Sequence, residues 1–314
     1  MSGKKVLITG GLGNLGSKLT IYLEKLGYQV SVLTRKAKNR IDNSKYEVIE
    51  ADITNLDDLK IKLNFEIDFC IHAASYNEFF LPGYAKKALE VNALGTRNIL
   101  EVLSGKNVEN FVYFSTFHVY GAETGIINEA SDVNPKNDYA STHLFAEYYV
   151  KQFGFTHNLN YTILRLTNSY GAPTFADTDK WYLVLNDLTR SAYVEGKVII
   201  KGNGKARRDF IYMEDVAVII DKLLRIPATK GTFNLSANKT YTVYDLAVLV
   251  KAVYERKFGE LINIEINCPD SSVSNEIEIR NDKLASIIDF QIRDKITGEI
   301  IKMFELLQKK NNVR

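Results

Sequence analysis

The chain is poor in the residues that stabilise small proteins through covalent or metal crosslinks. Its 314 residues include only two cysteines, Cys70 and Cys268, and four histidines. Neither cysteine has a second Cys or a His at metal-ligand spacing, so the sequence argues against disulfides and against a zinc site. We expect two unreactive thiols and no bound metal.

An excess of one charge and a long apolar run are also missing. Forty Lys and Arg residues nearly balance 38 Asp and Glu residues, for a net charge of +2. This balance offers no basic face of the size that nucleic acid requires, and it suits a small anionic ligand better. No apolar stretch approaches the ~20 uncharged residues of a membrane span, and the first predicted strand leaves no room for a signal peptide before it. A cytoplasmic protein with neither membrane nor nucleic-acid partners is expected.

Low-complexity linkers and internal repeats are absent as well, and 46% hydrophobic residues suffice for a large core. Short apolar runs alternate with amphipathic ones from the N-terminus. Strands are expected at 6–8, 28–33, 46–49, 68–73, 110–115 and 161–166, and helices at 14–25, 85–103 and 139–153. Repeated strand–helix units with short connections predict an α/β fold, a doubly wound parallel sheet of the Rossmann type with helices on both faces.

The pattern changes beyond Leu166. Loops near 171–180 precede a predicted helix at 182–195 and a strand at 198–201, and 233–236 has the composition of a further buried strand. We expect a dinucleotide-binding domain in residues 1–166, completed by parts of 207–237. Residues 167–314 are expected to form mainly a smaller substrate-binding lobe, which folds with the first domain as one cooperative unit.

Three glycines, Gly10, Gly13 and Gly16, separate the first predicted strand from the first helix. In a phosphate-binding turn Gly10 permits the tight bend, Gly13 lets backbone amides approach a pyrophosphate, and Gly16 brings the helix close to the strand. The helix start at Asn14 and Leu15 then presents unpaired N–H groups to the phosphates. A plain glycine-rich loop is the alternative, and the strand and helix on either side favour the cofactor site.

The end of the second strand bears on the choice of cofactor. NAD-binding folds usually carry an acidic residue there for the adenosine ribose, whereas this chain has Thr34 and Arg35. Without a carboxylate, Arg35, Lys36 and Lys38 could attract a 2′-phosphate, so NADP is not excluded beside NAD. A solvated basic loop is the alternative.

More cofactor contacts are expected after the third and fourth strands. Asp52 is placed to accept a hydrogen bond from the adenine amino group. Ala73 and Ala74 are small enough for a cofactor to pass, although their size could equally serve strand packing. The predicted cofactor set also includes Ile53, Ser75 and Asn92. The aromatic residues of the same region are expected either to cover the sugar or nicotinamide or to form a core cluster: Tyr76, Phe79 and Phe80.

Three segments at or after strand ends carry the strongest functional signal: FSTFHVYG at 114–121, YASTH at 139–143 and LRLTNSYG at 164–171. Further matching segments are IHAAS at 71–75, VNALGTRNIL at 91–100, RRDFIYMEDVA at 207–217 and FNLSANKTYTVYDLA at 233–247. Together with the glycine turn they resemble the extended short-chain dehydrogenases/reductases of the nucleotide-sugar epimerase and dehydratase family, over almost the whole chain. The resemblance implies an NAD-dependent oxidoreductase that acts on a nucleotide-diphosphate sugar.

By that resemblance Thr116 matches the family's active-site Ser or Thr, and Tyr139 its acid/base. Asn168 matches a substrate contact and Arg208 a diphosphate or nucleotide contact. Chemistry agrees, because oxidation of a sugar hydroxyl requires hydride loss from carbon and proton loss to a base, and a phenol within hydrogen-bond reach can serve. Thr116 would position the same hydroxyl. Ligands in open α/β sheets also bind outside the carboxyl ends of the strands.

One position departs from the family pattern. The family has a Lys four residues after the Tyr, where its charge lowers the phenol pKa and its amine binds the nicotinamide ribose, and here that residue is His143. A unit charge ~4 Å away at an effective dielectric of ~20 contributes roughly 4 kcal/mol, on the order of 3 pKa units. A neutral His143 would supply almost none of this, so we expect Tyr139 to stay protonated near neutral pH and to favour donating a proton to a ketone. The alternative is that His143 only donates a hydrogen bond to the ribose.

Basic residues near 205–208 are predicted to bind the substrate diphosphate. Lys205, Arg207 and Arg208 are close in sequence, although a solvated strand edge would have the same composition. Relatives carry another diphosphate-binding Arg in the C-terminal lobe, which residues 268–275 lack, and Arg280 is the candidate replacement. His118 is a candidate substrate or cofactor contact, although a packed histidine is the favoured interpretation of this position.

Within the family the chain most resembles GDP-heptose C4 dehydrogenases, which implies a GDP-linked sugar of a bacterial capsular polysaccharide. A nucleotide-sugar 4-epimerase or 4-keto reductase is the alternative, and a non-catalytic dinucleotide-binding regulator is the second. The helices at 85–103 and 139–153 match those of a four-helix interface in relatives, so a homodimer or homotetramer is expected. Phe145, Tyr148 and Tyr149 would lie in that contact or in the subunit's own core.

Overall fold

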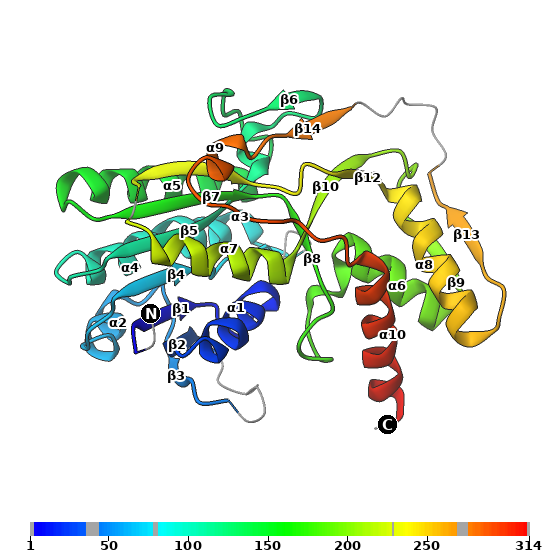
Figure 1. Cartoon of the computed structure of the whole chain (residues 1–314), viewed down its shortest axis with the longest axis horizontal. Coiled ribbons are helices and arrows are strands. Elements are labelled where there is room, and N and C mark those ends of the chain that lie inside the picture. Colours follow the sequence, from blue (N-terminus) through cyan, green and yellow to red (C-terminus); the bar gives the residue numbers. More distant parts are fainter. Residues whose placement is uncertain (1–2, 36–43, 78–80, 228, 269–275, 313–314) are drawn as a thin grey trace.

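A seven-stranded parallel sheet forms the larger of two lobes in the computed structural model, which describes residues 3–35, 44–77, 81–227, 229–268 and 276–312 (Figure 1). The strand order is β11–β7–β5–β4–β1–β2–β3, and every neighbouring pair is parallel. The strands are β1 (Lys5–Thr9), β2 (Gln29–Thr34), β3 (Glu47–Glu50), β4 (Phe69–His72), β5 (Asn110–Thr116), β7 (Tyr161–Leu166) and β11 (Gly231–Leu235).

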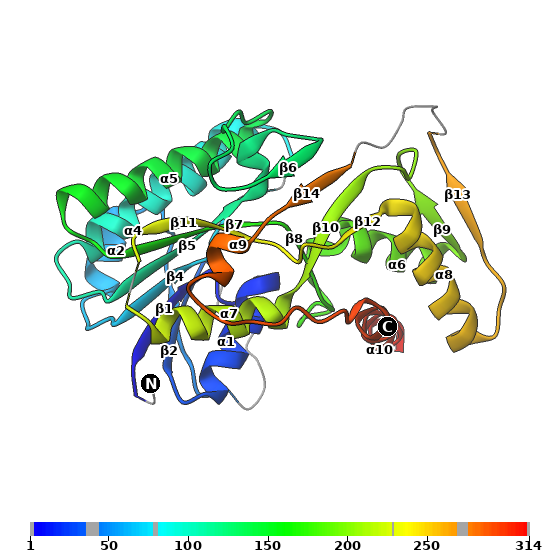
Figure 2. The same ribbon diagram turned by 45° about the horizontal axis from the view of Figure 1, so that its top comes forward.

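Helices cover both faces of this sheet (Figure 2). The helices are α1 (Asn14–Lys25) and α7 (Met213–Arg225) on one face, and α2 (Leu56–Lys62), α4 (Thr96–Leu103) and α5 (Asp138–Thr156) on the other. Successive residues of β1 point to opposite faces, so Ile8 packs with α1 and α7 while Leu7 packs with the other three helices. Apolar runs that are buried on both sides are typical of parallel sheets. The predicted doubly wound α/β fold is confirmed.

One predicted element differs from the observed structure. The helix expected at 85–103 is divided into α3 (Tyr84–Ala88), a π-helix η1 (Leu89–Gly95) and α4. Within η1 the side chain of Asn92 bonds the backbone of Tyr76, and a Cβ on Gly95 would lie 2.7 Å from Ile53. The spacing of apolar residues could not predict this π-helix, because the contacts found there join it to segments that are distant in the sequence.

The smaller lobe contains short sheets and long helices. Its sheets are β12–β10–β8 and β13–β9. The elements are β8 (Asn168–Tyr170), η3 (Lys180–Tyr182), α6 (Val184–Glu195), β9 (Lys197–Ile200), β10 (Arg207–Tyr212), β12 (Thr240–Thr242), α8 (Val243–Phe258), β13 (Asn263–Ile266) and α10 (Ile296–Asn312). Four further elements pack against the larger lobe: η2 (Phe117–Tyr120), β6 (Gly125–Ile127), β14 (Ile277–Ile279) and α9 (Asp282–Ala285). Leu188, Val250 and Phe304 share one buried cluster, which joins α6, α8 and α10.

The chain returns to the main sheet after β10. The strand predicted at 233–236 is β11, which pairs with β7 at the edge of the sheet. The strand expected at 198–201 is β9, and the helix expected at 182–195 is α6. Near the C-terminal end, β14 pairs with β6, so a late segment is tied to one that directly follows β5 and η2.

The remaining sequence expectations concern single groups. Cys70 is buried, Cys268 is exposed, and neither forms a disulfide. Across the described ranges no cluster of three or more His, Cys, Asp or Glu side chains is arranged to hold a metal ion. No helix in this part of the chain is both long and apolar enough to cross a membrane.

Candidate active site

A cleft of about 1130 Å³ opens at the carboxyl ends of the parallel strands, where the two lobes meet. Residues that end or follow β1, β2, β4, β5 and β7 line it from one side, and Leu185, Asn186 and Arg208 line it from the smaller lobe. The strand order reverses between β1 and β4, which is the place where open α/β sheets bind ligands. The cleft is therefore the candidate active site.

The glycine turn forms what we call the cofactor end of the cleft. Gly10 has a φ of +69°, and a Cβ there would lie 2.9 Å from the backbone of Ala74. A Cβ on Gly16 would lie 2.1 Å from the carbonyl oxygen of Gly10. The turn, α1 and the segment after β4 thus pack backbone against backbone, which no larger residue would allow.

The start of α1 has the features of a phosphate site. Its N-cap is Gly13, so no side chain caps the helix, and its first turn contains no acidic residue. The buried Oδ1 of Asn14 has no hydrogen-bond partner among the described residues. Leu15 and Gly16 also line the cleft. Uncapped N–H groups and an unpaired polar atom beside a cleft fit the pyrophosphate of a dinucleotide.

The predicted adenosine contacts are only partly in the cleft. Thr34, Arg35 and Ile53 line it, whereas Asp52 does not. Oδ1 of Asp52 accepts hydrogen bonds from the backbone N and the hydroxyl of Thr54, at 2.9 and 2.8 Å. The adenine contact of Asp52 stays a prediction. Four residues of the sequence argument lie outside the described part of the chain: Lys36, Lys38, Phe79 and Phe80.

The segment after β4 places Ala73, Ala74 and Ser75 on the cleft wall, as predicted for cofactor contacts. Asn92 lies behind that wall. Its Oδ1 accepts from the backbone N of Tyr76 at 2.7 Å, and its Nδ2 donates to the carbonyl of Tyr76 at 3.1 Å. Asn92 is 1% exposed, so in this structure it shapes the loop after β4 instead of facing a ligand.

Thr116 and Tyr139 meet at what we call the reacting end of the cleft. Thr116 ends β5, and Tyr139 lies in the first turn of α5, whose start is capped by Asn137. Both side chains line the cleft. Burial raises the pKa of Tyr139 to about 12, while the Thr116 side chain and the charge of Lys180 oppose that rise. The phenol is therefore protonated at neutral pH, as expected from the sequence.

Helix α5 is held against the sheet by a buried ion pair below the reacting end. Arg165 of β7 donates from Nε and Nη2 to the two carboxylate oxygens of Glu147, at 2.9 and 2.8 Å. The hydroxyl of Ser115 adds a 2.6 Å bond to the same carboxylate. This bidentate pair fixes α5 to β5 and β7, and with it the position of Tyr139 relative to Thr116.

His143 lies one turn after Tyr139, with 4.6 Å between the ring centroids. Its Nδ1 is 2.8 Å from the hydroxyl of Tyr113, and its Nε2 is 3.0 Å from the hydroxyl of Ser75. Burial lowers the pKa of His143 to about 3, so the ring is neutral. His143 therefore supplies no positive charge to Tyr139. Both ring nitrogens have protein partners, and a bond to the ribose would require exchange of one of them.

The three remaining substrate candidates on the cleft wall are His118, Asn168 and Arg208. His118 stays accessible to solvent within the cleft, and its ring centroid lies 4.1 Å from that of Phe117. Partial desolvation and the nearby charge of Arg208 lower the pKa of His118 to about 4. Nδ2 of Asn168 donates to the carbonyl of Asp209 at 3.0 Å, which ties β8 to β10 at this point.

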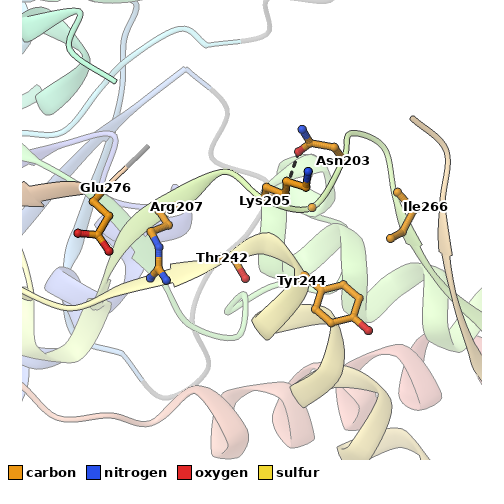
Figure 3. A pocket seen from close by; sticks show the side chains of 8 residues that line it. Asn203, Lys205, Arg207, Thr242, Tyr244, Ile266 and Glu276 are labelled. Carbon is orange, nitrogen blue, oxygen red and sulfur yellow. Dashed lines mark hydrogen bonds between the residues drawn. The ribbon is translucent and has the colours of Figure 1, made fainter. Parts of the chain in front are cut away.

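The predicted basic cluster is divided between two sites. Lys205 and Arg207 line a separate groove of about 540 Å³, together with Tyr244 and Glu276 (Figure 3). Neighbouring residues of β10 point to opposite faces, so Arg208 reaches the cleft while Arg207 reaches the groove. Arg280 lies in neither, and its Nε donates to Glu278 at 2.9 Å. The structure does not bring these basic side chains together.

Sequence reasoning missed a group that comes from η3 and the segment after β4. Nζ of Lys180 donates to Oδ1 of Asn77 at 3.0 Å, and the hydroxyl of Tyr182 donates to the same oxygen at 2.6 Å. All three residues line the cleft. No periodic pattern or motif marks residues 177–182, so only the nearby strand end, with its LRLTNSYG segment, could have drawn attention to them.

Comparison with known proteins agrees with this geometry. The model of the NAD dependent epimerase/dehydratase family matches residues 6–236. The chain belongs to this family. Membership confirms the expected enzyme class, an extended short-chain dehydrogenase/reductase, and the family description confirms NAD as the predicted cofactor.

Individual relatives carry UDP- and dTDP-sugar names. The "Putative UDP-glucose 4-epimerase" of Methanocaldococcus jannaschii is 30% identical over 281 residues, which cover 83% of this chain and 89% of that protein. Human dTDP-D-glucose 4,6-dehydratase is 27% identical over 94% of this chain and 84% of its own length. The crystal structure of UDP-glucose 4-epimerase from Thermotoga maritima, with UDP-glucose, matches with a TM-score of 0.83 at 21% identity, over 98% of this chain and 99% of that one. This last likeness shows the shared fold.

Proposed function

We propose that the protein is an NAD-dependent nucleotide-sugar 4-epimerase that acts on a UDP- or dTDP-linked sugar. The observation that carries the proposal is that Thr116 and Tyr139 line, at the strand ends, a cleft whose other end is the glycine turn at the start of α1. Epimerisation needs few groups beyond this pair, because the same centre is oxidised and then reduced.

Each step of that chemistry can be assigned to residues of the cleft. NAD held by the glycine turn and by the ends of β1, β2 and β4 would supply the hydride acceptor. Thr116 would orient the C4 hydroxyl, and the deprotonated, tyrosinate form of Tyr139 would take its proton during oxidation and return that proton to the ketone oxygen during reduction. Arg208 and Asn168 would hold the diphosphate and sugar. The protonated state of Tyr139 in the protein alone favours the reducing direction.

The finer expectation of a GDP-heptose C4 dehydrogenase has less support than the 4-epimerase alternative. The relatives compared above are named for UDP- and dTDP-sugars, and none for a GDP-sugar. GDP-sugars are therefore included among the substrates of the experiment described below. Arg35 lines the cleft, so binding of NADP is to be compared with that of NAD in the same experiment.

The expected oligomer also remains a proposal. Phe145 and Tyr148 on α5 are 54% and 53% exposed, while Tyr149 packs partly into the subunit's own core. Leu89 and Leu94 of η1 are each 45% exposed as well. Apolar side chains on these two helices are what a homodimer or homotetramer with a four-helix interface would cover.

The test is to incubate NAD-saturated protein with UDP-, dTDP- and GDP-hexoses. The absorbance of reduced nicotinamide and the identity of the sugar are followed together. We expect the 4-epimer of a UDP- or dTDP-sugar to form without net reduction of NAD. Tyr139→Phe should lower this rate by roughly 100-fold or more while NAD still binds. If NAD binds but no sugar nucleotide changes, the regulator alternative replaces this proposal.

A further inference from the structure

We propose that Lys180 supplies Tyr139 with the positive charge that relatives obtain from a lysine one turn further along the helix. This inference rests on the proposed acid/base role of Tyr139. In this chain the helix position is His143, which is neutral, so the cation has to come from another element. The structure assigns it to η3, on the opposite wall of the cleft.

The ammonium group of Lys180 is held in place inside the cleft. Its side chain is 18% exposed. Nζ donates to Oδ1 of Asn77 at 3.0 Å and lies 3.3 Å from the hydroxyl of Tyr182, which itself donates to Asn77. Asp179 lies 3.4 Å away, but its side chain is 66% exposed, so solvent screens much of its charge. Bonds to η3 and to the segment after β4 thus fix a cation whose side chain is mostly removed from water.

Among the described residues, the histidines and tyrosines around Tyr139 carry no positive charge at neutral pH, and the nearby charge of Arg208 acts on His118. His143 on its own helix and His118 from η2 are neutral, with pKa values lowered to about 3 and about 4. Tyr113 of β5 is a buried neutral phenol whose pKa is raised by burial. Tyr182 of η3 raises the pKa of Tyr139, and Lys180 is the group whose charge lowers it.

The source of the charge has a consequence for the reaction. Lys180 is the first residue of η3, which is joined to α6 by Leu183, and residues 182–186 line the cleft on the side of the smaller lobe. The base strength of Tyr139 then depends on the position of a segment that faces the substrate. A lysine on α5 would instead be fixed to the same helix as Tyr139.

The first experiment measures the charge effect without any turnover. 3-Fluorotyrosine is placed at position 139, and its ionisation is followed by 19F NMR as the pH is raised. We expect Lys180→Met to raise the pKa of the fluorinated phenol by roughly one unit, and Lys180→Arg to keep it near the original value. Lys180→Gln, which can still bond Asn77, should behave like Lys180→Met and guards against a loss of folding.

The matched control is Lys197→Met, which removes a lysine paired with Glu265 far from Tyr139 in sequence and outside the cleft. It should leave the titration unchanged. An unchanged pKa in folded Lys180→Met or Lys180→Gln protein overturns the proposal. This outcome is independent of whether the proposed 4-epimerase activity is found.

The second experiment uses the pH profile of sugar oxidation, with the substrate identified above. Lys180→Met should move the rise in rate to higher pH by roughly one unit, and so lower the rate at neutral pH about tenfold. Adding His143→Lys to Lys180→Met should restore the original profile, because the charge returns on the helix. A lower rate with an unmoved pH profile would show a merely structural role for Lys180 and refute the proposal.

Discussion

At the cofactor end of the cleft the ligand-facing groups come from one unbroken stretch, residues 10–16, whereas the reacting end gathers side chains from distant segments. The first is made of backbone, with glycines where any Cβ would collide. The second combines Ser75, Thr116, Tyr139, His143 and Lys180 from separate elements. A site built from closely packed backbone tolerates no added side-chain atom. In a site built from side chains, a charge that one segment supplies in one protein can be supplied by a different segment in another.

The largest effect is expected from an added methyl group at the cofactor end. Gly16→Ala places a Cβ 2.1 Å from the carbonyl oxygen of Gly10, so either the turn or α1 must move. We expect a loss of roughly 3 kcal/mol, which is more than 100-fold in NAD affinity, or failure to fold. Calorimetric NAD binding and thermal unfolding measure this. Gly105→Ala is the control, since a Cβ there meets nothing within 4 Å. Normal NAD binding by Gly16→Ala would show that the cofactor end does tolerate an added side-chain atom, and so contradict the difference drawn between the two ends of the cleft.

Two buried rings, His143 at the reacting end and His72 in β4, should make the protein sensitive to acid. His72 and His143 are buried, and burial lowers the pKa of each to about 3. Because these folded-state values lie below the ordinary value of about 6.5, the unfolded chain binds protons that the folded chain excludes. The free energy of unfolding is therefore unaffected by these groups above pH ~6.5 and falls below it, by roughly 2–3 kcal/mol at pH 5.5 for the two together.

Urea unfolding at pH 7.5 and 5.5 measures this acid sensitivity. His72→Gln, which removes one titrating ring, should lose roughly 1.4 kcal/mol less stability than the native protein between the two pH values. In the native protein His72 lies 2.6 Å from the hydroxyl of Thr9 and 2.9 Å from that of Thr96, so the comparison is made within each variant, between pH values. Identical changes in both proteins would show that the buried ring does not titrate as described.

Adjacent arginines test whether the cleft or the groove binds the sugar nucleotide. Arg208→Met removes a charged donor from the cleft wall and should raise the KM for the sugar nucleotide by roughly 10- to 100-fold, with little change in kcat. Arg207→Met, on the same strand but facing the groove, should change the KM by less than about twofold. Steady-state kinetics of both variants decide the point. A larger effect at Arg207 would move the diphosphate site to the groove of Figure 3.

The smallest effect is expected from restoring the helix lysine alone. His143→Lys adds a cation one turn from Tyr139, but it also breaks the contacts to Tyr113 and Ser75, and Lys180 already acts on the phenol. We expect the rate of sugar oxidation near neutral pH to rise by at most about tenfold. His157→Lys, at the exposed C-terminal end of the same helix, is the control. No gain, or a loss, would count against a role for helix-borne charge here.

The sequence predicted most of the fold, and its motifs identified Thr116 and Tyr139, the pair to which we assign the catalytic role, because both depend on local order. Alternating apolar runs and a glycine turn between a strand and a helix identify a doubly wound sheet. The motifs at residues 114–121 and 139–143 then place Thr116 and Tyr139 at adjoining points of it. The sequence did not predict the π-helix in residues 89–95, because the spacing of apolar residues contains no information about the contacts of Asn92 and Gly95.

By itself the sequence determined which residues could reach the strand ends, since strand direction and the two-residue alternation along a strand follow from the order of the chain. Only the tertiary structure decided that Arg207 and Arg208 face different sites, that Asn92 lies behind the cleft wall, and that Lys180 lines the same cleft as Tyr139. The physical reason is the sequence separation over which each property is determined. Backbone geometry is set by neighbours in the chain, whereas the burial and charge environment of a side chain depend on segments that are distant in the sequence and come together only on folding.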